Sequence, residues 1–541
     1  MGRQGAKRKR HEKKEKGGGT SAAAALAATT AASPSQPPAA AAAAAEQLVD
    51  GEDDALVDVV DASQTDVLMA EAGAGPALTK RCAKRDTPAR LMRWLVAPVS
   101  LDEFAASYYE FMPLHVKRGE AGYLDGLLTI AELRRWLKEG KFKYRQNVDV
   151  VRFDAAKGRK VNVNGAAGTT ADAAEVWRNF KEQGCSLRVL HPQRWSDSLH
   201  LLLHVLERHW NCAVGCNAYL TPAGSQGFAP HSDDVDVFVL QLEGTKAWRI
   251  YPPQAGAQEL WPRVSSRDFK PQELPTPQDV NLQPGDLLYL PRGTIHEATS
   301  SSGEHSLHIT VSTGHRTTWA DFLHIALDGA LAMAAEEEPE LRRNVPSDAM
   351  NHLGIVHSEV DGAAPDEQDP VDNRREELMD QMRSLCATVL SHLPVDAAAD
   401  AFAARFQAQR LPPPDAAEQC VPVRKAAGIY VSFGGCARLA LEDDFAMVYH
   451  PFENQRLLHM EHDDDAGAQH GCLQFNVEVA PALEMALVAT PQNPLTLRDA
   501  VKAAEPDASA EDVASALQTL CDAGICKTTQ TQAGTMAPSP S

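Results

Sequence analysis

The chain has 541 residues, 44% of them hydrophobic, and a formal net charge of −21 at pH 7. This length predicts two to four globular units, and no apolar run reaches the roughly 18 residues of a membrane span. The first 16 residues carry a charge of +6, so the rest of the chain carries −27. An acidic body argues against a broad DNA-binding face and suits a basic protein partner. The ten cysteines form no CxxC pair, which predicts reduced, buried thiols.

Residues 1–85 are predicted to be a disordered tail. The basic run at residues 7–16 is typical of nuclear or nucleolar targeting, and a solvated basic tail or a non-specific RNA-binding arm are the alternatives. An Ala- and Pro-rich stretch follows to Ala45. The acidic patch Glu46–Glu71 has few apolar residues, so we expect it to stay unfolded as well.

Alternating helical and strand patterns follow between Thr87 and Trp210. The helix near Leu91 has apolar residues at helical spacing, Ser100 is a predicted N-cap, and Thr129 with Glu132 forms a predicted capping box. Residues 154–172 are predicted to be a loop. The remaining predicted elements are helices at Thr129–Glu139, Ala173–Glu182 and Trp195–Trp210, and strands at Tyr144–Phe153 and Cys185–Leu190.

Short strands separated by Pro and Gly turns occupy Ala213–Thr313, with no helix between them. This pattern predicts an antiparallel double-stranded β-helix, or jelly roll, and not a parallel sheet. We therefore expect a mainly β jelly-roll domain over residues 86–315.

A possible metal site stands out in this jelly roll. His231 and Asp233 open a predicted strand that continues through Val235–Leu242, and as positions i and i+2 of a strand they would point into one cavity. His296 follows a strand and a Pro-Arg-Gly turn. Two histidines and one carboxylate are the facial-triad ligand set of non-haem Fe(II) oxygenases. Zinc is the main alternative, but no third histidine lies at zinc-site spacing. By parity Asp234 and Asp236 should point away from the metal, and His305, His308 and His315 are predicted to be structural sheet histidines.

The residues around this triad carry a more specific resemblance. The motifs are NAYLTP at 217–222, SQGFAPH at 225–231, VLQLEGxKxWRxY at 239–251, GDLLYxPRGTIH at 285–296 and HSLHxTxST at 305–313. Together they resemble the ribosomal oxygenases, nucleolar JmjC-type protein hydroxylases that depend on 2-oxoglutarate. The resemblance runs from about Leu91 to about Lys527. Ser232 departs from it, because close relatives carry Tyr there.

The resemblance implies roles for named residues. Fe(II) would be held by His231, Asp233 and His296, with 2-oxoglutarate and O2 as co-substrates. Asn217 and Tyr219 would lie on the face that holds 2-oxoglutarate. Lys246 would pair with its distal carboxylate, and Ser312 would add a hydroxyl there. Arg188 is either a substrate contact at the edge of the site or a structural ion-pair residue.

Two further units are predicted after the jelly roll. Residues 316–412 hold apolar helical stripes at Thr317–Met333 and Glu376–Leu393, which favour a homodimerisation region, or else helices that pack back on the jelly roll. Residues 413–528 hold short strands and then three helices, the order of a winged-helix-like domain. Its third helix has few bases, so we expect a protein-contact or structural role and no sequence-specific DNA binding. Residues 529–541 are predicted to be a disordered tail.

The resemblance implies an oxygenase of the nucleus and nucleolus that hydroxylates a histidine of a large-subunit ribosomal protein. A histone lysine demethylase acting in chromatin is the first alternative. A non-catalytic nucleolar scaffold or transcription cofactor is the second, although the intact triad and Lys246 argue against it.

Overall fold

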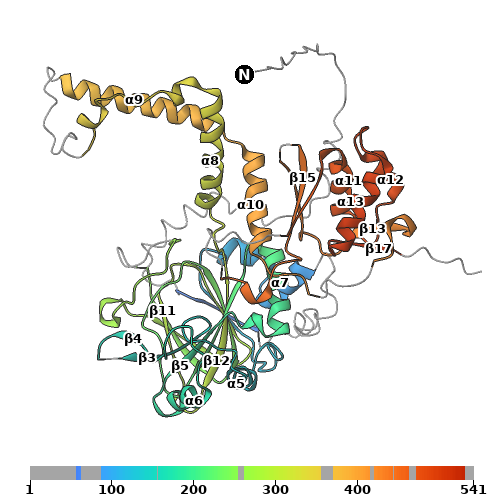
Figure 1. The fold of residues 1–541 in the computed structure, drawn as a ribbon. Helices are drawn as coiled ribbons and strands as arrows, with labels where there is room; N and C mark the ends of the chain where they lie inside the picture. The colour runs from blue at the N-terminus through green and yellow to red at the C-terminus, as the bar shows by residue number, and fades with distance from the viewer. Residues whose placement is uncertain are drawn as a thin grey trace, which may run out of the picture. The chain divides into compact units, whose positions relative to one another are not determined.

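A computed structural model describes residues 56–62, 87–154, 156–253, 261–354, 370–414, 420–442, 444–461 and 471–529 (Figure 1). The predicted basic cluster, the Ala-rich stretch and the tail after Thr529 lie outside the described residues. No helix among the described ranges is long and apolar enough to cross a membrane.

The predicted helices before the jelly roll are confirmed. Ser100 accepts a hydrogen bond from the Glu103 backbone N–H at 3.1 Å and caps a short helix that continues as a π-helical turn. Thr129 and Glu132 form the predicted capping box. The helices are α3 (Thr87–Val96), α4 (Leu101–Glu103), η4 (Phe104–Tyr108), α5 (Ile130–Lys138), α6 (Ala173–Glu182) and α7 (Asp197–Trp210).

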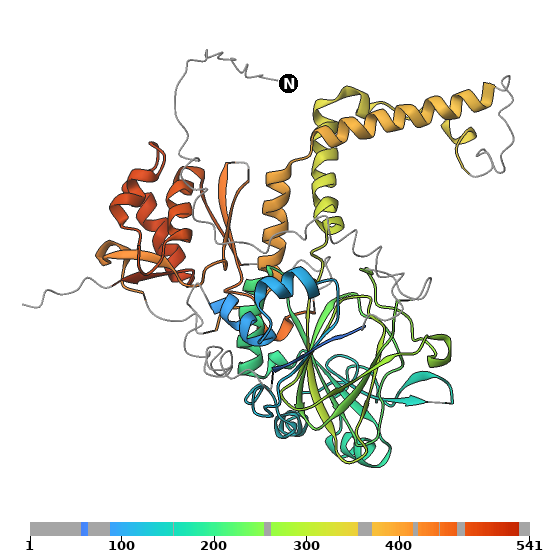
Figure 2. The ribbon, with the colours of Figure 1, turned by 180° about the vertical axis from the view of Figure 1, so that it is seen from behind.

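Two sheets form the jelly roll, which agrees with the predicted fold, and their strands pair antiparallel except for β1 with β2 (Figures 1 and 2). The larger has the order β1-β2-β10-β7-β12-β6-β5-β3-β4, and the smaller has the order β11-β8-β9. Apolar side chains from both sheets, among them Val239, Trp248 and Leu288, pack together as one core. The strands are β1 (Asp58–Asp61), β2 (Leu114–Lys117), β3 (Val148–Asp154), β4 (Arg159–Asn162), β5 (Ser186–Leu190), β6 (Gly215–Thr221), β7 (Asp236–Glu243), β8 (Lys246–Ile250), β9 (Gln278–Leu282), β10 (Leu287–Leu290), β11 (His296–Ser300) and β12 (Ser306–Thr313).

Three predictions about local structure were wrong. The acidic patch expected to be unfolded contains β1, which pairs in parallel with β2 and places Val57, 1% exposed, against the core between the sheets. The predicted loop 154–172 contains β4, which pairs with β3. Strand β7 begins at Asp236, so His231 and Asp233 lie before the strand and not on it. Only β1 has a partner that is remote in the chain, whereas β4 forms a hairpin with the preceding strand β3.

Three helices follow the jelly roll: α8 (Trp319–Glu337), α9 (Pro370–Ser391) and α10 (Val395–Gln409). Helix α8 packs against both α9 and α10, and the rings of Phe322 and Phe402 meet at 5.5 Å. Several large apolar side chains on these helices are nevertheless exposed, including Trp319 at 70% and Met382 at 61%. The predicted stripes are therefore only partly covered by this chain.

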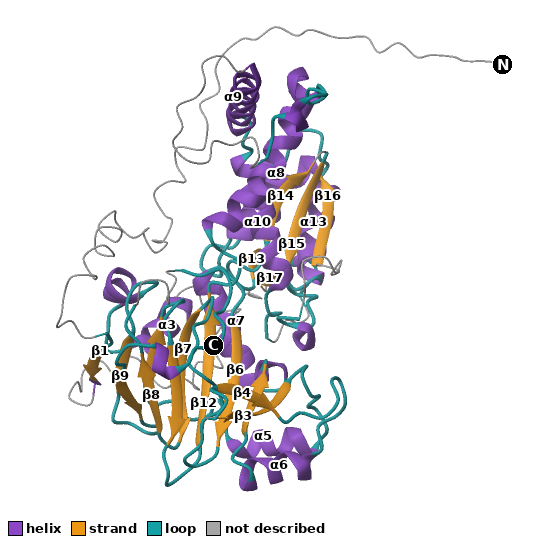
Figure 3. Cartoon of the chain, turned by 90° about the vertical axis from the view of Figure 1, so that its left-hand side faces the viewer, coloured by secondary structure: helices purple, strands orange, loops and turns teal. Residues whose placement is uncertain are grey.

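The C-terminal part has its own hydrophobic core, separate from that of the jelly roll. Figure 3 shows its strands and helices beside one another. The three helices expected from the sequence are present. The elements are β13 (Gly428–Val431), β14 (Arg438–Glu442), β15 (Phe445–His450), β16 (Gly471–Asn476), α11 (Ala480–Val488), α12 (Leu497–Ala503), α13 (Ala510–Asp522) and β17 (Cys526–Thr529), with β13 paired to β17.

Candidate metal centre

The three predicted ligands converge on one point. Nε2 of His231 lies 4.0 Å from Oδ1 of Asp233, and Nε2 of His296 lies 3.8 Å from Oδ2 of Asp233. All three ligand atoms lie within 4.8 Å of one another. Among the described residues no other group of three His, Cys, Asp or Glu side chains meets this spacing.

Backbone carbonyls orient both imidazoles. Nδ1 of His231 lies 2.8 Å from the carbonyl oxygen of Ala229, and Nδ1 of His296 lies 2.9 Å from that of Thr294. An N–H donated from Nδ1 fixes the tautomer and leaves the Nε2 lone pair free for a metal. Burial, and secondarily the charge of His231, lower the pKa of His296 to about 4, so His296 is neutral at pH 7.

This donor set fits Fe(II). Two imidazole nitrogens and one carboxylate are the facial triad, which leaves further coordination positions open. A structural zinc site would instead close with a fourth protein ligand. Gly293 (φ 89°) makes the turn that brings His296 back to the site, and its N–H donates to the Asp233 carbonyl at 2.9 Å.

A buried lysine lies near the triad. Lys246, the first residue of β8, is only 5% exposed, and burial lowers its pKa to about 7. Its Nζ donates to Oγ1 of Thr221 at 3.1 Å and lies 3.4 Å from Nδ1 of His308. No carboxylate of the described residues forms an ion pair with it. Such an ammonium group suits a bound anion, because a charge-assisted hydrogen bond is strong in a desolvated site.

Side chains of strand β6 lie near Lys246 and share one face, as the i, i+2 rule predicts. Asn217 and Tyr219 pair in register with Thr310 and His308 of β12, so their side chains share one face. The Tyr219 and His308 rings stack at 4.9 Å with an interplanar angle of 5°. Oδ1 of Asn217 is buried and has no hydrogen-bond partner among the described residues. An unpaired buried oxygen of this kind is what a ligand with a donor, or a bound water, would satisfy.

The sequence missed two residues that contact Lys246. His308 was expected to be a structural sheet histidine, but it lies between Lys246, Tyr219 and Trp248, with the Trp248 ring centroid 5.5 Å away. Thr221 contacts Lys246 and continues the Asn217, Tyr219 alternation along β6, so that alternation could have found it.

Ser312 is not placed beside Lys246. Its hydroxyl lies 2.9 Å from Nε2 of His315, and its backbone pairs in register with Gly215 and Val237. It lies four residues along β12 from His308, roughly 13 Å at the usual strand rise. The hydroxyl next to Lys246 therefore belongs to Thr221, and the expected contact of Ser312 with the distal carboxylate is not supported.

Arg188 forms a structural ion pair and also lies at the edge of the site, so both alternatives left open by the sequence apply to it. Its Nε donates to Oδ2 of Asp149 at 3.1 Å, which is a structural ion pair. Its guanidinium carbon also lies 5.7 Å from the centre of the Phe228 ring, and that ring centre is 6.1 Å from the ring of His231. The ion pair therefore holds Arg188 at the edge of the metal site.

Two nearby acids point elsewhere, as parity predicts for both. Asp236 is fully buried and accepts a hydrogen bond from the Tyr289 hydroxyl at 2.8 Å, and burial raises its pKa to about 6. Asp234 accepts a hydrogen bond from Ser265 at 2.7 Å. Neither belongs to the group of possible metal ligands.

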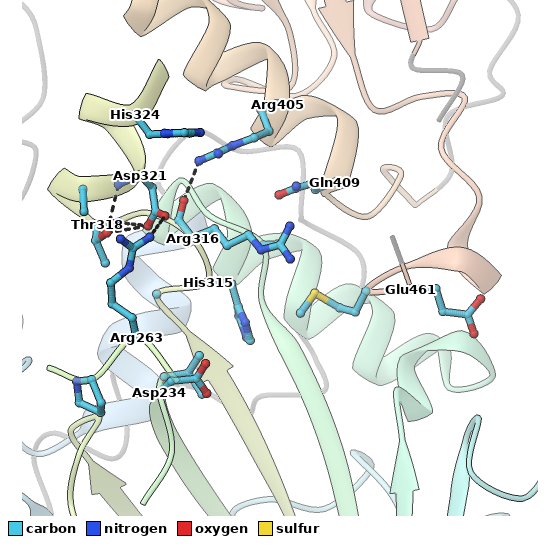
Figure 4. A pocket seen from close by; sticks show the side chains of 16 residues that line it. Asp234, Arg263, His315, Arg316, Thr318, Asp321, His324, Arg405, Gln409 and Glu461 are labelled. Atoms are coloured by element: carbon cyan, nitrogen blue, oxygen red, sulfur yellow. Dashed lines mark hydrogen bonds and ion pairs between the residues drawn. The ribbon is translucent and has the colours of Figure 1, made fainter. Parts of the chain in front are cut away.

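A cavity of about 870 Å³ is lined by residues at the end of the jelly roll and by the helices that follow it (Figure 4). Asp234 and His315 line it from the rim, Asp321 from α8 and Arg405 from α10. Asp321 is paired with Arg263 at 2.8 Å, so its charge is already balanced. The three triad residues do not line this cavity.

Comparisons with known proteins agree with this geometry. Residues 188–322 match the family model described as JmjC domain. The human protein named Ribosomal oxygenase 1 is 37% identical over 469 residues, which cover 82% of this chain and 68% of that protein. The Dictyostelium discoideum protein named Bifunctional lysine-specific demethylase and histidyl-hydroxylase NO66 is 37% identical over 401 residues, covering 72% and 74%.

Solved structures of YcfD from Escherichia coli are also similar. One is 18% identical with a TM-score of 0.44, and it covers 79% of this chain and 98% of that one. Another, described as a ribosomal oxygenase in complex with cobalt and 2-oxoglutarate, is 18% identical with a TM-score of 0.42. From the JmjC match, the coverage of the curated relatives and the converged triad, the chain belongs to the JmjC family of ribosomal oxygenases and histidyl-hydroxylases.

Proposed function

We propose that this protein is an Fe(II)- and 2-oxoglutarate-dependent oxygenase that hydroxylates a histidine of a large-subunit ribosomal protein. The observation that carries the proposal is that one jelly roll contains both a facial triad and a buried lysine, Lys246, which forms no ion pair with a carboxylate of the described residues. Within the family, relatives named ribosomal oxygenase and histidyl-hydroxylase cover most of this chain.

Each pocket residue has a task in this proposal. His231, Asp233 and His296 hold Fe(II) through Nε2, a carboxylate oxygen and Nε2. When bound, iron, 2-oxoglutarate and O2 supply the oxidising chemistry: one oxygen atom enters the substrate C–H bond, and the co-substrate leaves as succinate and CO2. Lys246 and Thr221 bind the distal carboxylate of 2-oxoglutarate. The stacked rings of Tyr219 and His308 form a wall that keeps water out of the pocket.

The substrate is proposed to be a basic protein. The described body belongs to a chain whose net charge beyond residue 16 is −27, and such a field speeds the approach of a cationic partner. Ribosomal proteins and histones both meet this condition. Demethylation of histone lysine is therefore the second candidate, and the name of the Dictyostelium relative includes both activities.

Two further proposals concern assembly and location. We expect a homodimer through residues 316–412, because α8 and α9 expose apolar side chains. We expect a nuclear and nucleolar location from the basic run at residues 7–16, which lies outside the described residues.

Mass spectrometry tests the function directly. Purified protein is incubated with Fe(II), 2-oxoglutarate, and either ribosomal proteins or methylated histone peptides. We expect the mass of one added oxygen on a histidine of a large-subunit ribosomal protein, dependent on 2-oxoglutarate. Loss of methyl groups from histone lysine, without histidine hydroxylation, would favour the second candidate. No product with any substrate would favour the scaffold.

A further inference from the structure

The aromatic ring of Phe228 stands beside the metal ligand His231, with their ring centres 6.1 Å apart. Two positive groups approach this ring: Nζ of Lys160 lies 5.0 Å and the guanidinium carbon of Arg188 lies 5.7 Å from its centre. Tyr219 contacts the same ring, at 5.6 Å and nearly perpendicular. We call Phe228, Arg188 and Lys160 the Phe228 rim.

Separate parts of the fold hold these two cations. Arg188 on β5 is fixed by Asp149 of β3, and Nδ2 of Asn164 donates to the same carboxylate at 2.9 Å. Asp149 is 8% exposed and its negative charge is neutralised by Arg188, so it does not attract a cationic ligand. Lys160 comes from β4, the strand that the sequence failed to predict, and is partly buried.

The rim already disfavours positive charge. Burial lowers the pKa of Lys160, and the next largest cause is the charge of Arg188; Asp268 and Asp149 only partly oppose them. A third cation entering beside Phe228 would meet the same repulsion in a partly desolvated place, where charges interact more strongly than in water.

Recognition of methylated lysine has different requirements. A quaternary or methylated ammonium group is bound by free aromatic faces that surround it. Here the Phe228 ring is already approached by two resident cations, and the ring of Tyr219 stacks on His308. A neutral imidazole has no charge to lose on entry and can lie against Phe228.

We propose that the Phe228 rim is a charge filter that admits an uncharged substrate side chain to the iron and disfavours a methylammonium group, with Lys160 as a specificity-determining residue. The inference deepens the proposed function and rests on it for the identity of the favoured side chain. Two electrostatic effects then act at different distances. At long range the acidic body attracts a basic protein, and at short range the Phe228 rim selects which side chain of that protein reaches the metal.

The test compares two peptides that differ in one residue. The first is a ribosomal-protein peptide with one central histidine, and the second has trimethyl-lysine at that position. Their affinities are measured without O2 for the full-length protein loaded with Fe(II) and 2-oxoglutarate. We expect the wild type to bind the histidine peptide at least about tenfold more tightly, the scale of one partly screened charge. Lys160→Glu should reduce this ratio by about tenfold, and Lys160→Met should lie between.

Lys157→Glu is the matched control. Lys157 lies on the same hairpin but pairs with Asp154 and is 59% exposed, so its substitution changes the net charge equally without touching the rim. The control should leave the ratio unchanged, and thermal unfolding checks that all variants fold. An unchanged ratio in Lys160→Glu, or an equal change in the control, overturns the filter. Absence of histidine hydroxylation in the wild type would instead overturn the proposed function, and the binding ratio stays measurable in that case.

Discussion

His231 and His296 exchange a pair of backbone hydrogen bonds. The N–H of His231 donates to the carbonyl of His296 at 3.1 Å, and the N–H of His296 donates back at 2.9 Å. The two imidazole ligands, 65 positions apart in the chain, are thus joined through the main chain as an isolated antiparallel bridge. This bridge holds the ligand geometry in place before any metal arrives, which lowers the cost of ordering the site on binding.

Loss of a single ligand should abolish activity. His231→Ala or Asp233→Ala leaves two protein ligands, so iron is held weakly and succinate formation should fall to background. Asp234→Ala is the matched control, because Asp234 bonds to Ser265 and lies outside the triad. Iron content and succinate release are measured together. Full turnover in either ligand variant would mean that the metal is held elsewhere.

Replacement of Lys246 should act on the co-substrate. Lys246→Ala should weaken 2-oxoglutarate binding by about 2–5 kcal/mol, as expected when one partner of a desolvated charge pair is removed. Calorimetry with the iron-loaded protein gives the Kd. An unchanged Kd would reduce Lys246 to a structural lysine at a turn.

Affinity for 2-oxoglutarate should also depend on pH. The pKa of Lys246 lies near 7 in the free protein, and a bound carboxylate keeps the lysine protonated. The complex then binds more protons than the free protein above that pKa, so affinity should fall as pH rises from 7 to about 9. Lys246→Arg provides the control, because arginine does not titrate in this range. A wild-type Kd that is flat over this interval would contradict the low pKa.

A pair of hydroxyl variants separates the two candidate partners of the lysine. Thr221→Val removes the group that accepts from Nζ and should weaken 2-oxoglutarate binding by about 1 kcal/mol. Ser312→Ala should leave that Kd unchanged, because Ser312 bonds to His315 at the other end of β12. The reverse result would restore the role that the sequence assigned to Ser312.

These variants also show how far sequence alone could go. The triad and Lys246 were found because each belongs to a motif that is contiguous in the chain. The sequence placed Ser312 beside Lys246, where His308 and Thr221 lie instead. Ser312 and His308 have the same parity on β12, so parity alone could not tell which of them lies near Lys246. Register is set by tertiary pairing, and here β12 also shifts register between Leu307 and His308.

The same reason explains the error at the N-terminus. The segment around Asp58 is acidic and short, so no local pattern favours a strand there. Its order comes from β2, from Tyr108, whose hydroxyl donates to Asp58 at 2.5 Å, and from burial of Val57. All of these partners are remote in sequence, so they cannot be inferred from the composition of the segment itself.

Val57 should therefore contribute to stability. Val57→Ala should lower the free energy of unfolding by about 2 kcal/mol, from the lost apolar burial and the cavity left behind. Val59→Ala, two residues further on in β1, is the control, because Val59 is 41% exposed and its substitution should cost less than about 0.5 kcal/mol. Chemical denaturation measures both. Equal, small effects would show that β1 contributes little to the stability of the jelly roll.

The apolar side chains left on the helices after the jelly roll predict a dimer. On α8, Trp319, Leu323 and Leu331 are 70%, 44% and 53% exposed, and on α9 Met382 is 61% exposed. Such a surface on a monomer exceeds scattered exposure and is typical of an interface. We expect light scattering of the purified protein to give the mass of two chains.

Charged residues in this surface should separate the subunits. Glutamate at Leu378, Met382 and Leu385 would have to be desolvated in an apolar interface, so the triple variant should be a monomer. Arg383→Glu on the same helix is the control, because Arg383 is 76% exposed and already paired with Asp380. A monomeric wild type, or a triple variant that stays dimeric, would contradict the dimer interface and favour the alternative, in which these helices pack on the jelly roll. If the dimer also shapes substrate access, the monomer should keep its iron and lose hydroxylation of a folded substrate. Normal activity in a proven monomer would show that assembly and catalysis are independent.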